Sequence, residues 1–323
     1  MKVVFWGKEF SRLKETLERN LEGREVAIAD VGDDSALAEA GMLVVRPVTV
    51  DDRLLSKAPR LKLVQQWGAG AEGIDVEACC RRGIYACNVP SIGMGNAEGV
   101  AEVALLHMLI LAKRLFRSRE KLMEGKVYTP PGITLWGKTA CVIGLGNVGR
   151  TIASRLKAFG MTVRGVNRTP PGDGEAWGVD EYFPLSGLKD AVKGARFAVA
   201  ALALAPETEG LLDEGFFSAM DGDAFFINVA RGGIVSRDAL LEALDGGKIA
   251  GAGLDVLWEE PHRTDDPFLT HPKVSVTPHI GGVNDAAMEG TLRFIAQNAA
   301  LVAEGREPMG RLDKKDRGRR RDP

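Results

Sequence analysis

Segment 139–160 reads TACVIGLGNVGRTIASRLKAFG and combines an apolar strand, a glycine-rich turn and the start of an amphipathic helix. Gly144, Gly146 and Gly149 stand in G-x-G-x-x-G spacing directly after the apolar run. In this context the first glycine permits a tight turn, the second lets a pyrophosphate approach the backbone, and the third lets helix and strand pack closely. The segment therefore predicts a dinucleotide-binding Rossmann domain.

The predicted coenzyme contacts extend beyond the glycines. Asn147 and Val148 open the helix, whose positive end is expected to face the phosphates. The next strand ends at Asn167, where NAD-binding folds usually carry an Asp or Glu that binds the ribose 2′-hydroxyl. Without that carboxylate a 2′-phosphate is not repelled, and Arg168 with Thr169 can bind it. The sequence thus slightly favours NADP over NAD, with stacking of Arg168 on adenine as an alternative that either coenzyme allows.

Short apolar runs alternate with amphipathic stretches on both sides of this segment. Including the first strand, the C-terminal side offers the candidate strands TACVIG, MTVRGV, RFAVAAL, DAFFINV, IAGAGLDV and KVSVTP. The N-terminal side offers KVVFW, EVAIA, MLVV and LKLVQQW. Such alternation is typical of parallel sheets flanked by helices. We therefore predict an α/β protein with two doubly wound parallel-sheet domains.

The domain boundaries follow from a stretch with apolar faces at 96–124, which predicts one helix of several turns linking two domains. We expect a substrate domain of residues 1–97 plus a returning helix within 284–310, and a dinucleotide-binding domain of residues 98–283. Residues 311–323, rich in basic side chains, are expected to form a disordered tail, with electrostatic docking to a partner as the alternative. The active site is expected in the cleft between the domains.

Composition narrows the partners and the location. The chain has 323 residues, is 45% hydrophobic and carries a formal net charge of −2, which gives no overall reason to bind nucleic acid or a membrane surface. Its longest apolar run, 103–112, is far shorter than the roughly 20 residues that span a bilayer. The four cysteines and four histidines lack metal-site spacing, so we expect no metal and a reducing cytoplasmic location.

Three later segments each carry one polar residue of a catalytic type: Arg231 in INVARGGIV, Glu260 in GAGLDVLWEEP and His279 in VTPHIGG. Reducing a keto acid needs a cation to hold the carboxylate and polarise the ketone, and an acid to protonate the oxygen. Arg231 and His279 fit these two roles. A carboxylate beside a histidine favours the imidazolium form, and Glu260 is the candidate, with Glu259 as its rival.

Taken together, these segments resemble the D-isomer-specific 2-hydroxyacid dehydrogenase family. The resemblance covers most of the chain, in the family's order, through LKLVQQWGAGAEGID, GNAEGVAEVAL, LWGKTACVIGLGNVG, FFINVARGGIVSRDALLEAL, GAGLDVLWEEP and VTPHIGG. It implies NAD(P)H-dependent reduction of a small 2-keto acid, of the glyoxylate or hydroxypyruvate type, to the D-2-hydroxy acid. It also implies a flavodoxin-like substrate domain, His279 as proton donor paired with Glu260, and a homodimer formed through the helix near 97–124.

Further site residues rest on the resemblance alone. It implies that the backbone N–H groups of Ala69 and Gly70 hold the substrate carboxylate, and that Asp255 lies toward the nicotinamide, with strand-end capping as the alternative. The chain departs from many relatives at Glu72, where they carry Asp, and this change is expected to reshape the substrate loop.

Two other functions remain open. A phosphoglycerate dehydrogenase belongs to the same family, and an NAD(P)H-sensing binding protein would use the same fold without turnover. His107, on an apolar helix, is interpreted as a packed or interfacial residue without a catalytic role.

Overall fold

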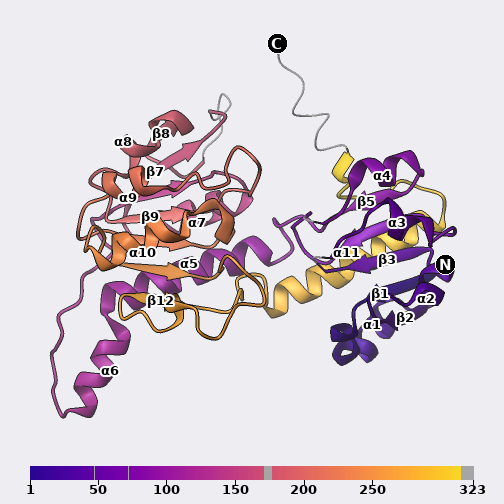
Figure 1. The fold of residues 1–323 in the computed structure, drawn as a ribbon, viewed down its shortest axis with the longest axis horizontal. Coiled ribbons are helices and arrows are strands. Elements are labelled where there is room, and N and C mark those ends of the chain that lie inside the picture. The colour runs from indigo at the N-terminus through magenta and orange to yellow at the C-terminus, as the bar shows by residue number, and fades with distance from the viewer. Residues whose placement is uncertain (47, 72, 171–176, 314–323) are drawn as a thin grey trace. The chain divides into compact units, whose positions relative to one another are not determined.

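The computed structural model describes residues 1–46, 48–71, 73–170 and 177–313. The chain forms two compact units, the first made of Met1–Asn96 together with the segment from Asn284 onward, and the second of Ala97–Val283 (Figure 1). Most of the predicted disordered tail lies outside the described residues. Its first residues do not fit that prediction, because Arg311 pairs with Cys87 in a β-bridge and the apolar Leu312 is buried.

A five-stranded parallel sheet with the order β2-β1-β3-β4-β5 forms the centre of the first unit (Figure 1). Its strands are β1 Lys2–Trp6, β2 Glu25–Ala29, β3 Met42–Val45, β4 Leu63–Gln66 and β5 Tyr85–Cys87. Along β1, Val4 and Trp6 face one core while Val3 and Phe5 face another, which explains why the strand is a continuous apolar run. This order is the flavodoxin type, so the predicted fold of this unit is confirmed.

Helices cover both faces of the first sheet. They are η1 Lys8–Leu13, α1 Lys14–Asn20, α2 Asp34–Glu39, α3 Asp52–Ser56, α4 Val76–Arg81 and α11 Asp285–Ala303. Leu37 of α2, Leu55 of α3 and Cys79 of α4 pack on one face. Leu17 of α1 and Ile295 of α11 pack on the other, so the returning helix completes the core of the first unit.

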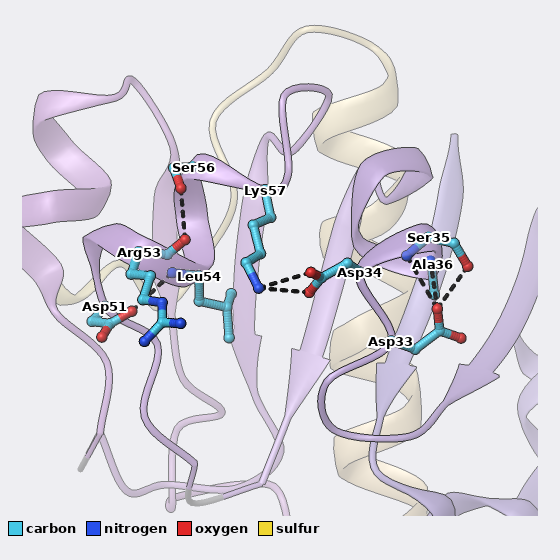
Figure 2. Close-up of polar contacts among 9 residues, drawn as sticks. All are labelled: Asp33, Asp34, Ser35, Ala36, Asp51, Arg53, Leu54, Ser56 and Lys57. Atoms are coloured by element: carbon cyan, nitrogen blue, oxygen red, sulfur yellow. Dashed lines mark hydrogen bonds and ion pairs between the residues drawn. The ribbon is translucent and has the colours of Figure 1, made fainter.

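Aspartates start two of these short helices, as Figure 2 shows. The Asp33 carboxylate accepts hydrogen bonds from the backbone N–H groups of Ser35 and Ala36, and Asp51 accepts one from Leu54 at 2.8 Å. Lys57, which ends α3, forms an ion pair with Asp34 of α2. Because short helices have few internal hydrogen bonds, such caps set where they begin.

The second unit contains a seven-stranded parallel sheet with the order β12-β11-β10-β9-β6-β7-β8. Its strands are β6 Thr139–Ile143, β7 Thr162–Asn167, β8 Glu181–Pro184, β9 Phe197–Ala200, β10 Phe225–Asn228, β11 Gly251–Leu254 and β12 Val274–Val276. The order reverses between β6 and β9, where doubly wound sheets open a crevice at the carboxyl ends of the strands. The predicted Rossmann fold is confirmed.

Helices again form a layer on each face of this sheet. They are α5 Asn96–Lys113, α7 Asn147–Ala158, α8 Leu188–Val192, α9 Glu214–Ala219 and α10 Arg237–Asp245, with the short η2 Leu185–Gly187, η3 Gly232–Ile234 and η4 Pro267–Leu269. A further helix, α6 Leu115–Met123, follows α5 and has no buried residue. Helices α5 and α7 share one core with Val142 of β6. Helices α8, α9 and α10 share the other with Ile143. None of the helices in the described ranges has the length and apolar character needed to cross a membrane.

The single helix expected over 96–124 is two helices. Arg114 adopts a left-handed conformation with φ 50°, and α6 beyond it has no buried residue. The end of α5 is fixed by the returning chain, since the N–H of Ile133 donates to the carbonyl oxygen of Ala112 at 2.9 Å. The Lys113 ammonium donates to the carbonyl oxygen of Ile133. Helix α5 therefore ends where its packing contacts with the rest of the unit end.

Two strands were not predicted, and both lie at sheet edges. Strand β5 has three residues, and β8 is half-exposed and ends in Pro184. An edge strand is covered less on its faces and needs no long apolar run, so neither segment carries the pattern on which the prediction depended.

Candidate active site

Three neighbouring strands of the second sheet bring the predicted catalytic residues to one edge. Arg231 follows β10, Glu260 follows β11 and His279 follows β12, and these strands are adjacent in the sheet. Because all strands run parallel, their carboxyl ends lie on the same side. The turn at Gly232 packs on the segment after β11, since a Cβ on that glycine would lie 2.3 Å from the Leu257 carbonyl oxygen.

His279 and Glu260 are in direct contact. Nδ1 of His279 lies 2.7 Å from Oε2 of Glu260, and the two side chains are 42% and 43% exposed. Glu260, and not the neighbouring Glu259, thus makes the hydrogen bond that the sequence predicted. The bond leaves Nε2 as the ring nitrogen that can face a substrate.

The guanidinium of Arg231 is held by its own turn. Its Nη1 donates to the carbonyl oxygen of Ala230 at 2.8 Å. Asn228, at the end of β10, braces the turn from below, because its side chain accepts from the Ala230 N–H at 3.0 Å and donates to the Arg231 carbonyl oxygen at 3.1 Å. A cation with a planar fork of donors is therefore fixed at the same edge as the His279–Glu260 pair.

Asp255 is buried and supports the turn that carries His279. Its Oδ1 accepts from the Thr277 hydroxyl at 2.6 Å and from the Ile280 N–H at 2.9 Å, and its Oδ2 accepts from the Gly281 N–H at 2.9 Å. The His279 N–H donates to the Asp255 carbonyl oxygen. These contacts match the capping alternative left open by the sequence, and the predicted coenzyme contact of Asp255 stays a prediction.

The glycine-rich turn has the shape that a dinucleotide needs. A Cβ on Gly144 would lie 2.7 Å from Leu202, and one on Gly149 would lie 1.8 Å from the Gly144 carbonyl oxygen. Nothing lies within 4 Å of a Cβ built on Gly146, the N-cap of the twelve-residue helix α7. The first and third glycines thus permit close packing, and the second leaves open space before a helix N-terminus, where a pyrophosphate would fit. Asn147 and Val148 form the first turn of that helix.

The end of β7 carries the three residues expected near the adenosine ribose. Asn167 is tied down on both sides, since its Oδ1 accepts from the Leu145 N–H at 3.3 Å and its Nδ2 donates to the Thr169 carbonyl oxygen at 3.0 Å. Arg168 and Thr169 are exposed. An exposed cation therefore directly follows Asn167, the position where an NAD-specific fold would place a carboxylate.

The predicted substrate-binding turn of the first unit follows β4. Ala69 and Gly70 are half-buried, and the Ala69 carbonyl oxygen accepts a hydrogen bond from the Asn88 side chain. Their role in holding a substrate carboxylate stays a prediction. Glu72, the departure from the family pattern, lies outside the described residues.

Two supporting residues were missed from the sequence. Thr277 lies inside the quoted VTPHIGG, but nothing in its spacing indicates a bond to Asp255. Arg150 follows Gly149 directly, and its Nε donates to the Leu145 carbonyl oxygen at 2.9 Å, bracing the glycine turn. The position of this charged residue, directly after the last glycine of the G-x-G-x-x-G motif, could have indicated its contact with the turn. Across the ranges with assigned positions, no group of three His, Cys, Asp or Glu side chains is placed to hold a metal ion.

Residues 105–281 match the family described as D-isomer specific 2-hydroxyacid dehydrogenase, NAD binding domain. A glyoxylate reductase of Thermococcus gammatolerans is 35% identical over 300 residues, which are 90% of this chain and 86% of that one. The chloroplastic D-3-phosphoglycerate dehydrogenase 2 of Arabidopsis thaliana is 35% identical over 83% of this chain, but the match spans 43% of that longer protein.

A solved structure is also similar to this chain over nearly its whole length. The crystal structure of the NADPH-dependent glyoxylate/hydroxypyruvate reductase from Sinorhizobium meliloti, in complex with citrate, superposes with a TM-score of 0.82 at 27% identity, over 96% of this chain and 97% of that one. The likeness therefore includes both units of the chain.

Proposed function

This chain belongs to the D-isomer-specific 2-hydroxyacid dehydrogenase family, and we propose that within it the protein reduces a small 2-keto acid of the glyoxylate or hydroxypyruvate type. It is an NAD(P)-dependent oxidoreductase, as are its relatives. The observation that supports the proposed chemistry most directly is the 2.7 Å contact between His279 and Glu260 at the sheet edge that also carries Arg231.

The proposed reaction assigns one task to each of the three side chains. The nicotinamide, when bound, supplies the hydride that reaches the keto carbon. Arg231 binds the substrate carboxylate and draws electron density toward the ketone oxygen. His279 donates a proton to that oxygen as negative charge develops, while Glu260 fixes the orientation of the ring. In the reverse direction, the neutral imidazole accepts the hydroxyl proton.

We propose NADPH as the preferred coenzyme. The support is local: Asn167 replaces the usual carboxylate, its amide tethers the segment to Thr169, and Arg168 is exposed beside the glycine turn. A dianionic 2′-phosphate there gains charge-assisted hydrogen bonds and meets no carboxylate at the end of β7.

A panel of substrates tests the proposed function. Purified protein would be given glyoxylate, hydroxypyruvate, pyruvate, phenylpyruvate and phosphohydroxypyruvate, each with NADPH and with NADH, and the loss of absorbance at 340 nm would be followed. We expect the highest kcat/KM with glyoxylate or hydroxypyruvate. A preference for phosphohydroxypyruvate would instead assign a phosphoglycerate dehydrogenase, and tight NAD(P)H binding without oxidation by any keto acid would assign a sensor.

No disulfide joins the four cysteines, all of which lie in the described ranges. Three of them are buried. Because thiols persist in reducing compartments, we propose that the enzyme works in the cytoplasm.

We further propose that the protein is a homodimer formed through the arm at 115–128, which comprises α6 and the loop after it and projects from the second sheet (Figure 1). The arm exposes apolar side chains that would be costly to leave in water, namely Leu115, Phe116, Leu122, Met123, Val127 and Tyr128. Met123 is 80% exposed and Tyr128 is fully exposed. A second copy offers the same apolar surface, as a twofold interface requires.

The double variant Phe116→Glu/Met123→Glu is expected to sediment as a monomer at micromolar concentration, where the unmodified chain sediments at twice that mass. In a twofold interface each substituted residue occurs once in each copy, so four carboxylates would be buried. This weakens association by at least about tenfold. Val31→Glu, a change at a 63% exposed valine of the first unit, should leave the mass unchanged. Monomeric behaviour of the unmodified chain would contradict the proposed dimer.

A further inference from the structure

The proposed reaction does not use His107, yet the fold is shaped around it. The residue lies in the middle of α5, and its side chain has no exposed surface. Strand β11 passes it at Gly253, where a Cβ would lie 2.5 Å from the His107 Cβ. A buried imidazole among the apolar buried residues of α5 needs polar partners, because a buried polar group without a hydrogen bond destabilises the fold.

Those partners form a chain of hydrogen bonds in which every proton can be assigned. Nδ1 of His107 lies 3.0 Å from the Ser275 hydroxyl, and Nε2 lies 3.0 Å from the Thr277 hydroxyl. The single hydroxyl proton of Thr277 is used on Oδ1 of Asp255, at 2.6 Å. Thr277 must therefore accept from His107, so Nε2 carries a proton, and in a neutral ring Nδ1 accepts from Ser275.

This series of hydrogen bonds ends at the carboxylate of Asp255, which holds the turn that carries His279. Asp255 accepts from the backbone N–H groups of Ile280 and Gly281, and its carbonyl oxygen accepts from the N–H of His279. His279 needs this support, because its φ of 53° lies in the left-handed region that residues other than glycine seldom adopt. Movement of the carboxylate would therefore move the imidazole away from Glu260.

We propose that His107 is a positioning residue for the proposed reaction: as a neutral imidazole protonated on Nε2, it orients Thr277 toward Asp255 and so fixes the turn that presents His279. The inference rests on the proposed function for its kinetic consequence but not for its geometry. Burial lowers the pKa of His107 to about 4, although the nearby Asp255 charge opposes this. The ring therefore stays neutral, and Nδ1 can accept from the Ser275 hydroxyl.

Kinetics of three variants separate positioning from packing. His107→Leu should lower kcat by about tenfold, the cost of a modest misplacement, while KM for the coenzyme stays within twofold. His107→Gln, which keeps one donor and one acceptor, should retain most of the rate. His107→Leu leaves the Ser275 hydroxyl without its imidazole partner and should lower Tm. The double variant His107→Leu/Ser275→Val removes that hydroxyl, so its Tm should return toward that of the unmodified protein while kcat stays low. If kcat recovers together with Tm, His107 serves packing alone and the inference fails.

A second readout does not depend on activity. With only four histidines in the chain, NMR of protein labelled with ¹⁵N-histidine can assign His107 through its absence in His107→Leu. We expect its ring to be protonated on Nε2 alone between pH 5 and pH 8, and the His279 signals to shift in the double variant. A proton on Nδ1, or unchanged His279 signals, would overturn the inference. If both results are as expected while no keto acid is reduced, the proposed function fails and the positioning role of His107 stands.

Discussion

Replacing His279 by alanine is expected to lower kcat by about 10² or more, while the Kd for NAD(P)H changes by less than about twofold. The variant removes the group that would protonate the ketone oxygen, but it leaves the glycine turn and the end of β7 untouched. The turn itself should persist, because Asp255 holds it through the backbone N–H groups of residues 279, 280 and 281. Steady-state kinetics and a coenzyme titration followed by fluorescence measure the two quantities.

The left-handed backbone at His279 calls for a matched control, since alanine is strained there whatever its chemistry. Asparagine tolerates this conformation better and cannot act as the acid, so His279→Asn should lose as much kcat as His279→Ala. Glu260→Gln keeps a neighbour of the same shape whose amide oxygen can still accept a hydrogen bond from Nδ1 of His279, so kcat should fall less than in either His279 variant. Near-normal turnover of His279→Asn would show that another group donates the proton.

Replacing Arg168 by alanine is expected to raise KM for NADPH by roughly 30-fold while KM for NADH changes by less than about twofold. A charge-assisted hydrogen bond to the 2′-phosphate contributes about 2 kcal/mol, and NADH lacks that phosphate. Steady-state kinetics with each coenzyme at saturating keto acid measure both constants. Equal changes for the two coenzymes would show that Arg168 stacks on adenine or has no contact with either.

Lys157→Ala is the matched control, because it removes a cation from the same unit, where it pairs with Asp180. Its effects on the two coenzymes should be small and equal. Asn167→Asp supplies the opposite test: the added carboxylate should repel the 2′-phosphate and improve the relative use of NADH, although it can no longer donate to the Thr169 carbonyl oxygen. If Asn167→Asp leaves the ratio of kcat/KM for NADPH to that for NADH unchanged, the 2′-phosphate does not bind beside the end of β7.

The sequence predicted the fold class, the Rossmann unit and the contact between His279 and Glu260, because each depends on local patterns. The glycine spacing after an apolar strand has few structural solutions. Carboxyl ends of parallel strands share an edge, so polar residues that follow neighbouring strands meet there. The edge strands were not predicted, because β5 has only three residues and β8 is half-exposed, so each carries a weak apolar pattern.

The role of His107 could not be read from the sequence, because its hydrogen-bond partners lie about 170 positions away. The break at Arg114 likewise depends on a loop that returns to the Ala112 carbonyl oxygen. Propensity alone extends the helix, whereas tertiary contacts end it. Both features depend on hydrogen bonds between distant parts of the chain, which local sequence patterns do not indicate.

The division of the chain also has a consequence for its synthesis. The second unit, Ala97–Val283, is inserted between two parts of the first. Helix α11, which covers one face of the first sheet through Leu292, Ile295 and Ala299, is translated after the whole inserted unit. The ribosome thus releases every residue of the coenzyme-binding unit while one apolar face of the N-terminal sheet is covered by η1 and α1 but still lacks α11. Co-translational folding must keep that face from aggregating until residues 285–303 emerge.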